Sequence, residues 1–357
     1  MSLDSLQTTW FILITVLWSG FFVLEGFDFG VGMLTPFVGR TDEERRAAKE
    51  STGPFWDGNE VWLIVAGGAT FAAFPPWYAT MFSAYYIPLF LVLVALILRA
   101  AGTEWRERRE AGRWRRAWDW WIAASCCVVP LLVGVLFGGL LIGIPIDRSQ
   151  EFTGGFSDLV QPFALFTGVL FVALCVLQGL LFLRLKTRGA VYERATHTAR
   201  WVGLVVVALF AVHMVWMQAA AGSGLIPGAG AWLALTFLVA AALLSLEHDH
   251  HRGWAFTCSA AGIVFTVVNV FETLYPNTMV SSTKAAYNLT INDSSAKYTL
   301  TLMTIIAVVM IPVVLIYTAW NYWVFRGRMR TGPDPAAPPD PAAPPATTEP
   351  AAVPAAD

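Results

Sequence analysis

Long apolar runs follow one another along almost the whole chain. An apolar run of about 20 residues, folded as a helix, spans the hydrocarbon core of a bilayer. Of the 357 residues, 56% are hydrophobic and 13% are charged, whereas soluble domains carry about 25% charged residues. The sequence therefore predicts an all-α polytopic membrane protein with nine transmembrane helices. The predicted spans cover roughly residues 8–34, 50–74, 76–103, 115–144, 161–186, 197–222, 230–246, 253–275 and 298–325.

The basic residues are distributed very unevenly between the two sides of this predicted membrane domain. With nine spans, 20 of the 23 lysines and arginines fall on one side, and only Arg148, Lys284 and Lys297 fall on the other. An excess of basic residues marks the cytoplasmic side. We therefore expect the N-terminus outside the cell and the C-terminus in the cytoplasm. The net charge of −2 indicates no nucleic-acid partner.

The C-terminal residues differ in composition from the rest of the chain. Residues 333–357 contain nine prolines, and alanine fills most of the remaining positions. A segment of this composition cannot bury a core. We expect residues 1–332 to form the membrane domain and residues 333–357 to form a disordered cytoplasmic tail without a catalytic role.

Acidic residues occur where the apolar runs begin or end. Asp57 and Glu60 lie three residues apart at the start of the second span, and Glu25 and Asp28 repeat this spacing in the first. Residues i and i+3 of a helix share a face, so each pair points one way. Asp119 opens the fourth span from the same, cytoplasmic side. We expect these five carboxylates to gather there, with no lysine or arginine in the middle of their three spans to neutralise them.

Two interpretations of these acids compete. Ionisable groups inside a membrane are costly and usually serve charge or proton movement, which favours a path for proton uptake. Alternatively, an acid near a helix N-terminus is stabilised by the helix dipole, which would explain Asp57 and Asp119 without a function. Glu60 lies too deep for a capping role, so the Asp57–Glu60 pair favours proton transfer. For Asp119 the two interpretations have equal weight.

The histidines indicate that this chain does not hold several haems. Histidine is the usual haem ligand, and only His213 lies within a predicted span, flanked by Met214 and Met217. We expect His213 to make a polar contact between helices. The residues 247–251 resemble a solvated loop rather than a metal site, and the four cysteines predict neither a disulfide framework nor a metal site. Glu272, near the outer end of the eighth span, is expected to be isolated from the other acids.

Several motifs are unusual enough to compare with known families. The motifs are Gly26–Leu34, Gly53-Pro54, Trp56–Ile64, Ala66–Ala69, Phe71–Pro75, Trp118–Trp120, Ser281–Thr283, Tyr317–Trp320 and Tyr322-Trp323. Together they resemble subunit II of the cytochrome bd-type quinol oxidases of bacterial cell membranes. The resemblance extends over residues 1 to about 326 and is most specific in the first hundred.

The resemblance implies both an architecture and an activity. It implies two four-helix bundles, about 8–144 and about 161–275, and one peripheral helix, about 298–325. The partner would be a haem-bearing subunit I that carries haem b and haem d and oxidises a quinol, either menaquinol or ubiquinol. Subunit II supports that partner and helps to deliver protons, and in the family the aspartate of the tryptophan-flanked motif, here Asp57, belongs to the delivery route. Lipid and small accessory membrane subunits are further candidate partners.

The functional hypothesis is that this chain supplies cytoplasmic protons to an oxidase that reduces oxygen to water. Asp57 would be the first buried relay, aided by Glu60, Glu25, Asp28 and Asp119. An ion-coupled secondary transporter is the competing hypothesis, because intramembrane acids and spans interrupted by glycine and proline suit it. A purely structural scaffold is the third. Many such transporters contain inverted repeats, and this sequence shows no clear one.

Overall fold

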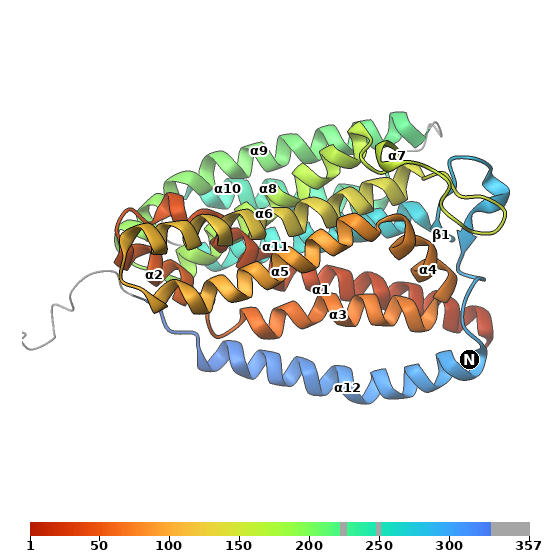
Figure 1. Cartoon of the computed structure of the whole chain (residues 1–357), viewed down its shortest axis with the longest axis horizontal. Coiled ribbons are helices and arrows are strands. Elements are labelled where there is room, and N and C mark those ends of the chain that lie inside the picture. Colours follow the sequence, from red (N-terminus) through yellow and green to blue (C-terminus); the bar gives the residue numbers. More distant parts are fainter. Residues whose placement is uncertain (222–226, 248–250, 330–357) are drawn as a thin grey trace, which may run out of the picture.

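The computed structural model describes residues 1–221, 227–247 and 251–329. Long helices run roughly side by side and make up most of this part of the chain (Figure 1). The helices are α1 (Leu3–Val38), α2 (Asp42–Glu50), α3 (Trp56–Ala73), α4 (Pro75–Ala84), α5 (Tyr86–Trp105), η1 (Arg106–Arg108), α6 (Gly112–Ile142), α7 (Phe156–Leu159), α8 (Pro162–Lys186), α9 (Ala190–Ala221), α10 (Ala229–Leu246), α11 (Arg252–Leu274), η2 (Ala285–Tyr287) and α12 (Lys297–Val324). The strands β1 (Asn277–Met279) and β2 (Leu289–Thr290) form one small antiparallel hairpin.

The predicted all-α membrane class is confirmed. Among the described residues, eight helices are long and apolar enough to cross a membrane. The second predicted span corresponds to α3, which has only 18 residues, includes Asp57 and Glu60, and is not among the eight. It nevertheless lies alongside α1 (Figure 1). The count of nine spans therefore stays a prediction.

The third predicted span is interrupted, contrary to the expectation of one run over 76–103. The chain forms α4, breaks at Tyr85 and continues as α5. Pro88 lies in the first turn of α5 and has no backbone N–H, so the helical hydrogen bond to the carbonyl of Ala84 cannot form. The start of α4 at Pro75 agrees with the predicted boundary after the second span.

Helix α8 packs against helices from both halves of the chain, which we describe as two groups. The first helix group comprises α1, α3, α5 and α6, and the second comprises α8, α9, α10 and α11; α8 packs against both α1 and α6. Glycines allow these close approaches. A Cβ atom on Gly30 would lie 2.8 Å from the Cα atom of Gly179, and one on Gly134 would lie 2.7 Å from the Cα atom of Gly168. Gly30 and Gly134 therefore allow α1 and α6 to pack closely against α8.

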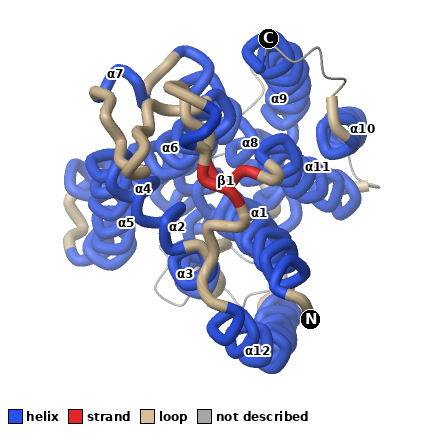
Figure 2. Tube along the Cα trace, turned by 90° about the vertical axis from the view of Figure 1, so that its right-hand side faces the viewer, coloured by secondary structure: helices blue, strands red, loops and turns tan. Residues whose placement is uncertain are grey.

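Helix α12 lies at the periphery. It stands apart from the other helices when the molecule is viewed end-on (Figure 2), and only 6% of its apolar window is buried. It contacts α1 and α3. At one end, the indole Nε1 of Trp10 donates a hydrogen bond to Thr304 Oγ1 over 3.0 Å. This helix matches the predicted peripheral helix in its bounds, while the predicted tail lies outside the described residues.

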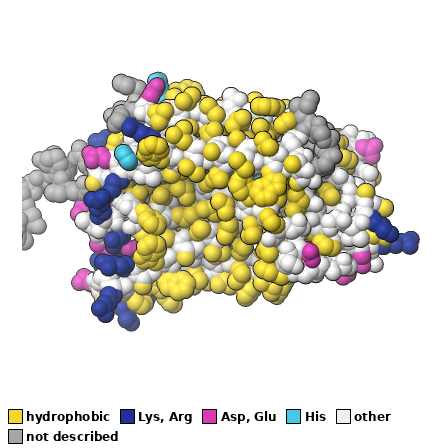
Figure 3. Space-filling view, turned by 90° about the horizontal axis from the view of Figure 1, so that it is seen from above, with side chains coloured by type: hydrophobic (Ala, Val, Ile, Leu, Met, Phe, Trp, Pro, Cys, Tyr) yellow, Lys and Arg dark blue, Asp and Glu magenta, His cyan; other side chains and the backbone are white. Residues whose placement is uncertain are grey.

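The surface separates into an apolar band and a charged end. On the face shown in Figure 3, lysine and arginine side chains gather at the end where α2 lies, beside a wide apolar band. We call this end, which comprises α2, η1 and the α8–α9 turn, the basic end. The N-terminus, α7 and the β1–β2 hairpin lie at the opposite end (Figure 1).

Candidate proton-transfer site

Helix α1 carries Glu25 and Asp28 into the interior of the first helix group. Their exposed fractions are 0% and 3%. Glu25 forms an ion pair with Arg99 of α5, whose guanidinium lies over the ring of Phe29 at 5.0 Å. The expectation that no basic residue neutralises these acids is therefore wrong for Glu25. The arginine comes from α5, a neighbouring span that carries none of the five acids.

Asp28 has no such counter-charge. Its Oδ2 atom accepts a hydrogen bond from Asn59 Nδ2 of α3 at 2.7 Å. Its Oδ1 atom is buried and has no hydrogen-bond partner among the described residues. A buried carboxylate without a cation is costly and relieves that cost by exchanging a proton. Asp28 thus differs from Glu25, whose charge is balanced by Arg99.

A cavity of about 250 Å³ connects the basic end with Asp28. At the inner end it is lined by Asp28, Arg99 and Cys126, and towards the basic end by Lys49 and Glu107. A volume of about 10–15 Å³ accessible to a water-sized probe holds one water, so this cavity has room for several. The arrangement offers a hydrated route from the surface to a buried carboxylate.

Lys49 is the half-buried cation of α2 beside this cavity. Burial, together with the nearby charge of Arg106, lowers the pKa of Lys49 to about 8, against the opposing effect of Glu107. The ammonium therefore titrates close to physiological pH.

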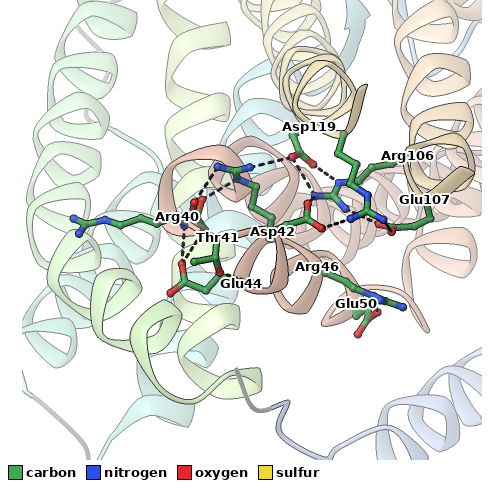
Figure 4. Close-up of polar contacts among 12 residues, drawn as sticks. Arg40, Thr41, Asp42, Glu44, Arg46, Glu50, Arg106, Glu107 and Asp119 are labelled. Atoms are coloured by element: carbon green, nitrogen blue, oxygen red, sulfur yellow. Dashed lines mark hydrogen bonds and ion pairs between the residues drawn. The ribbon is translucent and has the colours of Figure 1, made fainter. Parts of the chain in front are cut away.

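Asp119 belongs to a separate ion-pair cluster at the basic end (Figure 4). The fully buried Arg106 donates from Nε to Asp119 Oδ1 at 2.5 Å and from Nη2 to Asp42 Oδ1 at 2.7 Å. It also donates from Nη1 to Glu107 Oε1 at 2.6 Å. Burial raises the pKa of Asp42, but the hydrogen bonds and charges of Arg106 and Arg115 outweigh it, so that the pKa is lowered. The cluster fixes α2 against the turn between α5 and α6.

This placement favours a structural role for Asp119. Helix α6 begins at Gly112, so Asp119 lies about two turns from its N-terminus, where the helix dipole has little effect. Asp119 does not line the cavity, and Arg45 adds a second cation 3.8 Å from its Oδ2 atom. A part in proton transfer for Asp119 stays a prediction.

Asp57 and Glu60 do not join Glu25 and Asp28 in one cluster. Asp57 is exposed at the surface of α3 and does not line the cavity. Glu60 is half-buried and lies close enough to both Asp28 and Asp57 to interact with them electrostatically. The large apolar side chains Val61, Ile64 and Val65 of the same helix are exposed. Asp57 thus lies on an unpartnered face of α3 rather than in the chain's interior.

Three residues of this site were missed by sequence reasoning, namely Arg99, Asn59 and Tyr322. Arg99 lies near one end of the third predicted span, 76–103, where the sequence pattern assigns it no role. Asn59 lies within the tryptophan-flanked motif, between the two acids, and Tyr322 belongs to the last of the compared motifs. Membership of these motifs was the available signal for Asn59 and Tyr322.

Comparison with known proteins decides the family. The profile of the family described as cytochrome bd terminal oxidase subunit II matches residues 6–325. The cytochrome bd ubiquinol oxidase subunit 2 of Bacillus subtilis is 42% identical over 332 residues, which cover 91% of this chain and 97% of that protein. The chain belongs to the cytochrome bd oxidase subunit II family.

Other relatives agree with this assignment. The cytochrome bd-I ubiquinol oxidase subunit 2 of Escherichia coli K12 is 38% identical, with 91% of this chain and 96% of that protein covered. A chain of the bd oxidase structure from Geobacillus thermodenitrificans has the same fold, with a TM-score of 0.68 at 14% identity over 90% of this chain and 99% of the other. The predicted resemblance is confirmed, and the family favours the oxidase over the transporter.

His213 lies in the interior of the second helix group. His213 is buried, its ring stacks on Phe163 with centroids 5.0 Å apart, and its Nε2 atom lies 3.1 Å from Thr167 Oγ1. Because the Thr167 hydroxyl donates to the Phe163 carbonyl, it accepts from the imidazole N–H. Among the described residues no group of three His, Cys, Asp or Glu side chains could hold a metal ion. His213 makes the predicted contact between helices, whereas His248 and His250 lie outside the described residues.

Glu272 also has a local explanation. Its Oε2 atom accepts a hydrogen bond from the backbone N–H of Gly230 at 2.9 Å. Gly230 lies in the first turn of α10, whose N–H groups lack partners within the helix. Glu272 therefore caps α10 from the neighbouring α11 and has no contact with the acids of the first helix group.

Proposed function

We propose that this subunit II delivers protons to a haem-bearing subunit I, which oxidises a quinol and reduces oxygen to water. The observation that carries the proposal is the buried, cation-free carboxylate of Asp28 at the inner end of a cavity from the basic end. Haem b and haem d would belong to the partner, where they supply the redox chemistry. The residues of this chain only take up, hold and pass on protons.

The basic end would face the cytoplasm. Basic residues concentrate at that end, as they do on the cytoplasmic side of bacterial membrane proteins. Protons would then enter the cavity from the cytoplasm, beside Lys49 and Glu107. If the quinol releases its protons on the other side, the reaction separates charge across the membrane without a pump.

The route would continue from Asp28 towards the surface of α3. Glu60 lies within electrostatic reach of both Asp28 and Asp57. Asp57, the exposed acid of this series, would pass the proton to subunit I, which would cover the apolar face around Val61 and Ile64. Asp57 would thus be the last relay of this chain rather than the first. Glu25, held by Arg99, would set the local field without carrying the proton itself.

The test is the oxygen consumption of the purified two-subunit complex. Asp28→Asn keeps the shape of the side chain and removes its titrating group, so turnover should fall at least roughly tenfold with unchanged haem content, because a placed acid–base group contributes about 10²–10⁴. Asp57→Asn should also slow turnover. Asp4→Asn, the same change at the exposed start of α1, should have no effect.

Full activity of Asp28→Asn in a complex with normal haem spectra would contradict proton delivery through the cavity. If only Asp57→Asn has unchanged turnover, the proposed last step through Asp57 is wrong, and proton uptake through the cavity to Asp28 stands.

A further inference from the structure

We propose that Tyr322 of the peripheral helix α12 is a positioning residue that acts through Asn59 to aim Asp28 into the cavity. This inference rests on the proposed proton delivery through Asp28 and adds a role for α12. The juxtaposition involves three elements, because Tyr322 comes from α12, Asn59 from α3 and Asp28 from α1.

The three side chains form a continuous hydrogen-bond chain. The Tyr322 hydroxyl donates to Asn59 Oδ1 at 3.1 Å, and Asn59 Nδ2 donates to Asp28 Oδ2 at 2.7 Å. Asn59 Nδ2 also donates to the Leu24 carbonyl at 3.2 Å. Asn59 is 3% exposed. Every donor in the chain points from α12 towards α1.

The tyrosine and the Leu24 carbonyl together set which way the amide of Asn59 faces. An asparagine side chain can present either its oxygen or its NH2 group to a neighbour, and its hydrogen-bond partners decide between them. A phenol that donates to the oxygen leaves the NH2 group for Asp28. Since that group occupies Oδ2, the remaining oxygen of Asp28, Oδ1, is the one without a partner. Proton exchange with the cavity would then occur at Oδ1.

Neighbouring contacts hold the tyrosine in place. Its ring stacks on Phe55 with centroids 4.5 Å apart and planes 12° apart. The adjacent Asn321 donates from Nδ2 to the Pro54 carbonyl at 3.0 Å, just before α3 begins. Most of α12 is exposed, and these contacts tie the end of the helix nearest the Asp28 site, as the Trp10–Thr304 hydrogen bond ties the other end. A helix that only faced lipid would not need a buried polar contact of this kind.

Loss of the hydroxyl has a specific chemical consequence. Without it, the Asn59 amide can turn and offer its oxygen to Asp28, and an oxygen acceptor binds the protonated carboxyl group but repels the carboxylate. The protonated form of Asp28 is then favoured, and release of the proton becomes harder. Turnover should fall, and its pH profile should shift to higher pH.

The experiment compares Tyr322→Phe with Tyr317→Phe in the purified two-subunit complex. Phenylalanine keeps the stack on Phe55 and removes only the hydroxyl. Tyr317 lies on the same helix, is 60% exposed, and provides the matched control. We expect Tyr322→Phe to lower oxygen consumption roughly three- to tenfold, as for the loss of one buried hydrogen bond, and to move the pH profile upward. Haem spectra and complex yield should stay normal, and Tyr317→Phe should behave as wild type.

The possible failures are distinguishable. If Asp28→Asn is slow but Tyr322→Phe has the wild-type rate and pH profile, the positioning role is wrong and the proposed proton delivery stands. A Tyr322→Phe complex that is less stable but has an unshifted pH profile would also overturn the positioning role. If Asp28→Asn is fully active, the proposed function fails, and the role of Tyr322 fails with it.

Discussion

The two helix groups differ in their interior chemistry. In the first group the buried polar residues include the acids Glu25, Asp28 and Asp119 and the cation Arg99. In the second group, among the described residues, no carboxylate is buried, and the buried polar side chains include the neutral Gln178 and Asn269. The second group shows that helices of this membrane fold can pack together without buried acids. Of the buried acids of the first group, Asp28 is the one that lines the cavity.

The buried cations of the two groups also have different contacts. In the first group, Arg99 and the adjoining Arg106 pair with carboxylates. In the second, Arg184 donates from Nη2 to the Glu247 carbonyl, and Lys186 donates from Nζ to the Gly327 carbonyl. The ion pairs of Arg99 and Arg106 thus join buried acids of the first group to buried cations. Substitutions of these residues test whether the stability and the turnover of the complex depend on the charged residues of the first group.

The largest effect is expected for Arg106→Gln. This change leaves Asp119 buried without its main counter-charge and releases α2 from the α5–α6 turn. Removing one partner of a buried ion pair costs roughly 3–5 kcal/mol. We expect poor yield of the assembled complex and a lower thermal midpoint, measured by size-exclusion chromatography and thermal unfolding.

The matched control for Arg106 is Arg108→Gln. Arg108 lies two residues away in the same short helix and is exposed, so its loss should change stability by only a few tenths of a kcal/mol. Equal behaviour of the two variants would show that the cluster at the basic end does not support the fold.

The next largest effect concerns the buried pair of Glu25 and Arg99. Either Glu25→Gln or Arg99→Gln alone leaves one buried charge unpaired and should cost about 3 kcal/mol. The double variant removes both charges and should be more stable than either single variant. A double-mutant cycle on the thermal stability of the complex measures this coupling. Additive losses would mean that the two groups act independently and that the pair is not a closed unit.

A smaller effect is expected in the second helix group. His213→Phe keeps the stack on Phe163 and loses one neutral hydrogen bond to Thr167, which is worth about 1 kcal/mol. Turnover and the visible haem spectrum of the complex should be unchanged. Thr167→Val, which removes the other partner of the same hydrogen bond, should behave similarly. An altered haem spectrum in His213→Phe would contradict the division between the two groups.

The sequence predicted the membrane class and the acidic residues, but it could not predict their partners. Hydropathy is a local property, so the positions of most spans follow from it, and so does the peripheral helix. Whether Glu25 is neutralised depends on which face of α5 turns inward, and the sequence pattern assigns Arg99 no role. Tertiary packing therefore decided that Glu25 is paired and that Asp28 is not.

The same limit applies to Asp57 and Asp119. From spacing alone, both appeared to belong to one acidic cluster. Asp119 is instead paired by Arg106, which is 13 residues away in the chain, and Asp57 faces outward from α3. Counting residues from the start of a helix does not show which neighbouring helix a side chain faces. A second subunit adds a further unknown, because it changes which surfaces are exposed.

The smallest predicted effect is a pH dependence of stability caused by Lys49. Its pKa is about 8 in the folded protein, below the ordinary value of 10.5. Between these two values the unfolded chain binds more protons than the folded protein does, so the folded protein becomes more stable as pH rises. Lys49→Met removes this contribution. The thermal midpoint of the wild type, minus that of Lys49→Met, should therefore increase by up to a few degrees from pH 7 to pH 9.5.

The control for Lys49 must separate its burial from its charge. Lys49→Arg keeps a cation that does not titrate in this range, so its midpoint should stay low relative to Lys49→Met at every pH between 7 and 9.5. A wild-type curve parallel to that of Lys49→Met would show that this lysine does not titrate in the window. In that case the cavity entrance would carry a fixed positive charge, and the charge asymmetry between the two helix groups would extend to its surface.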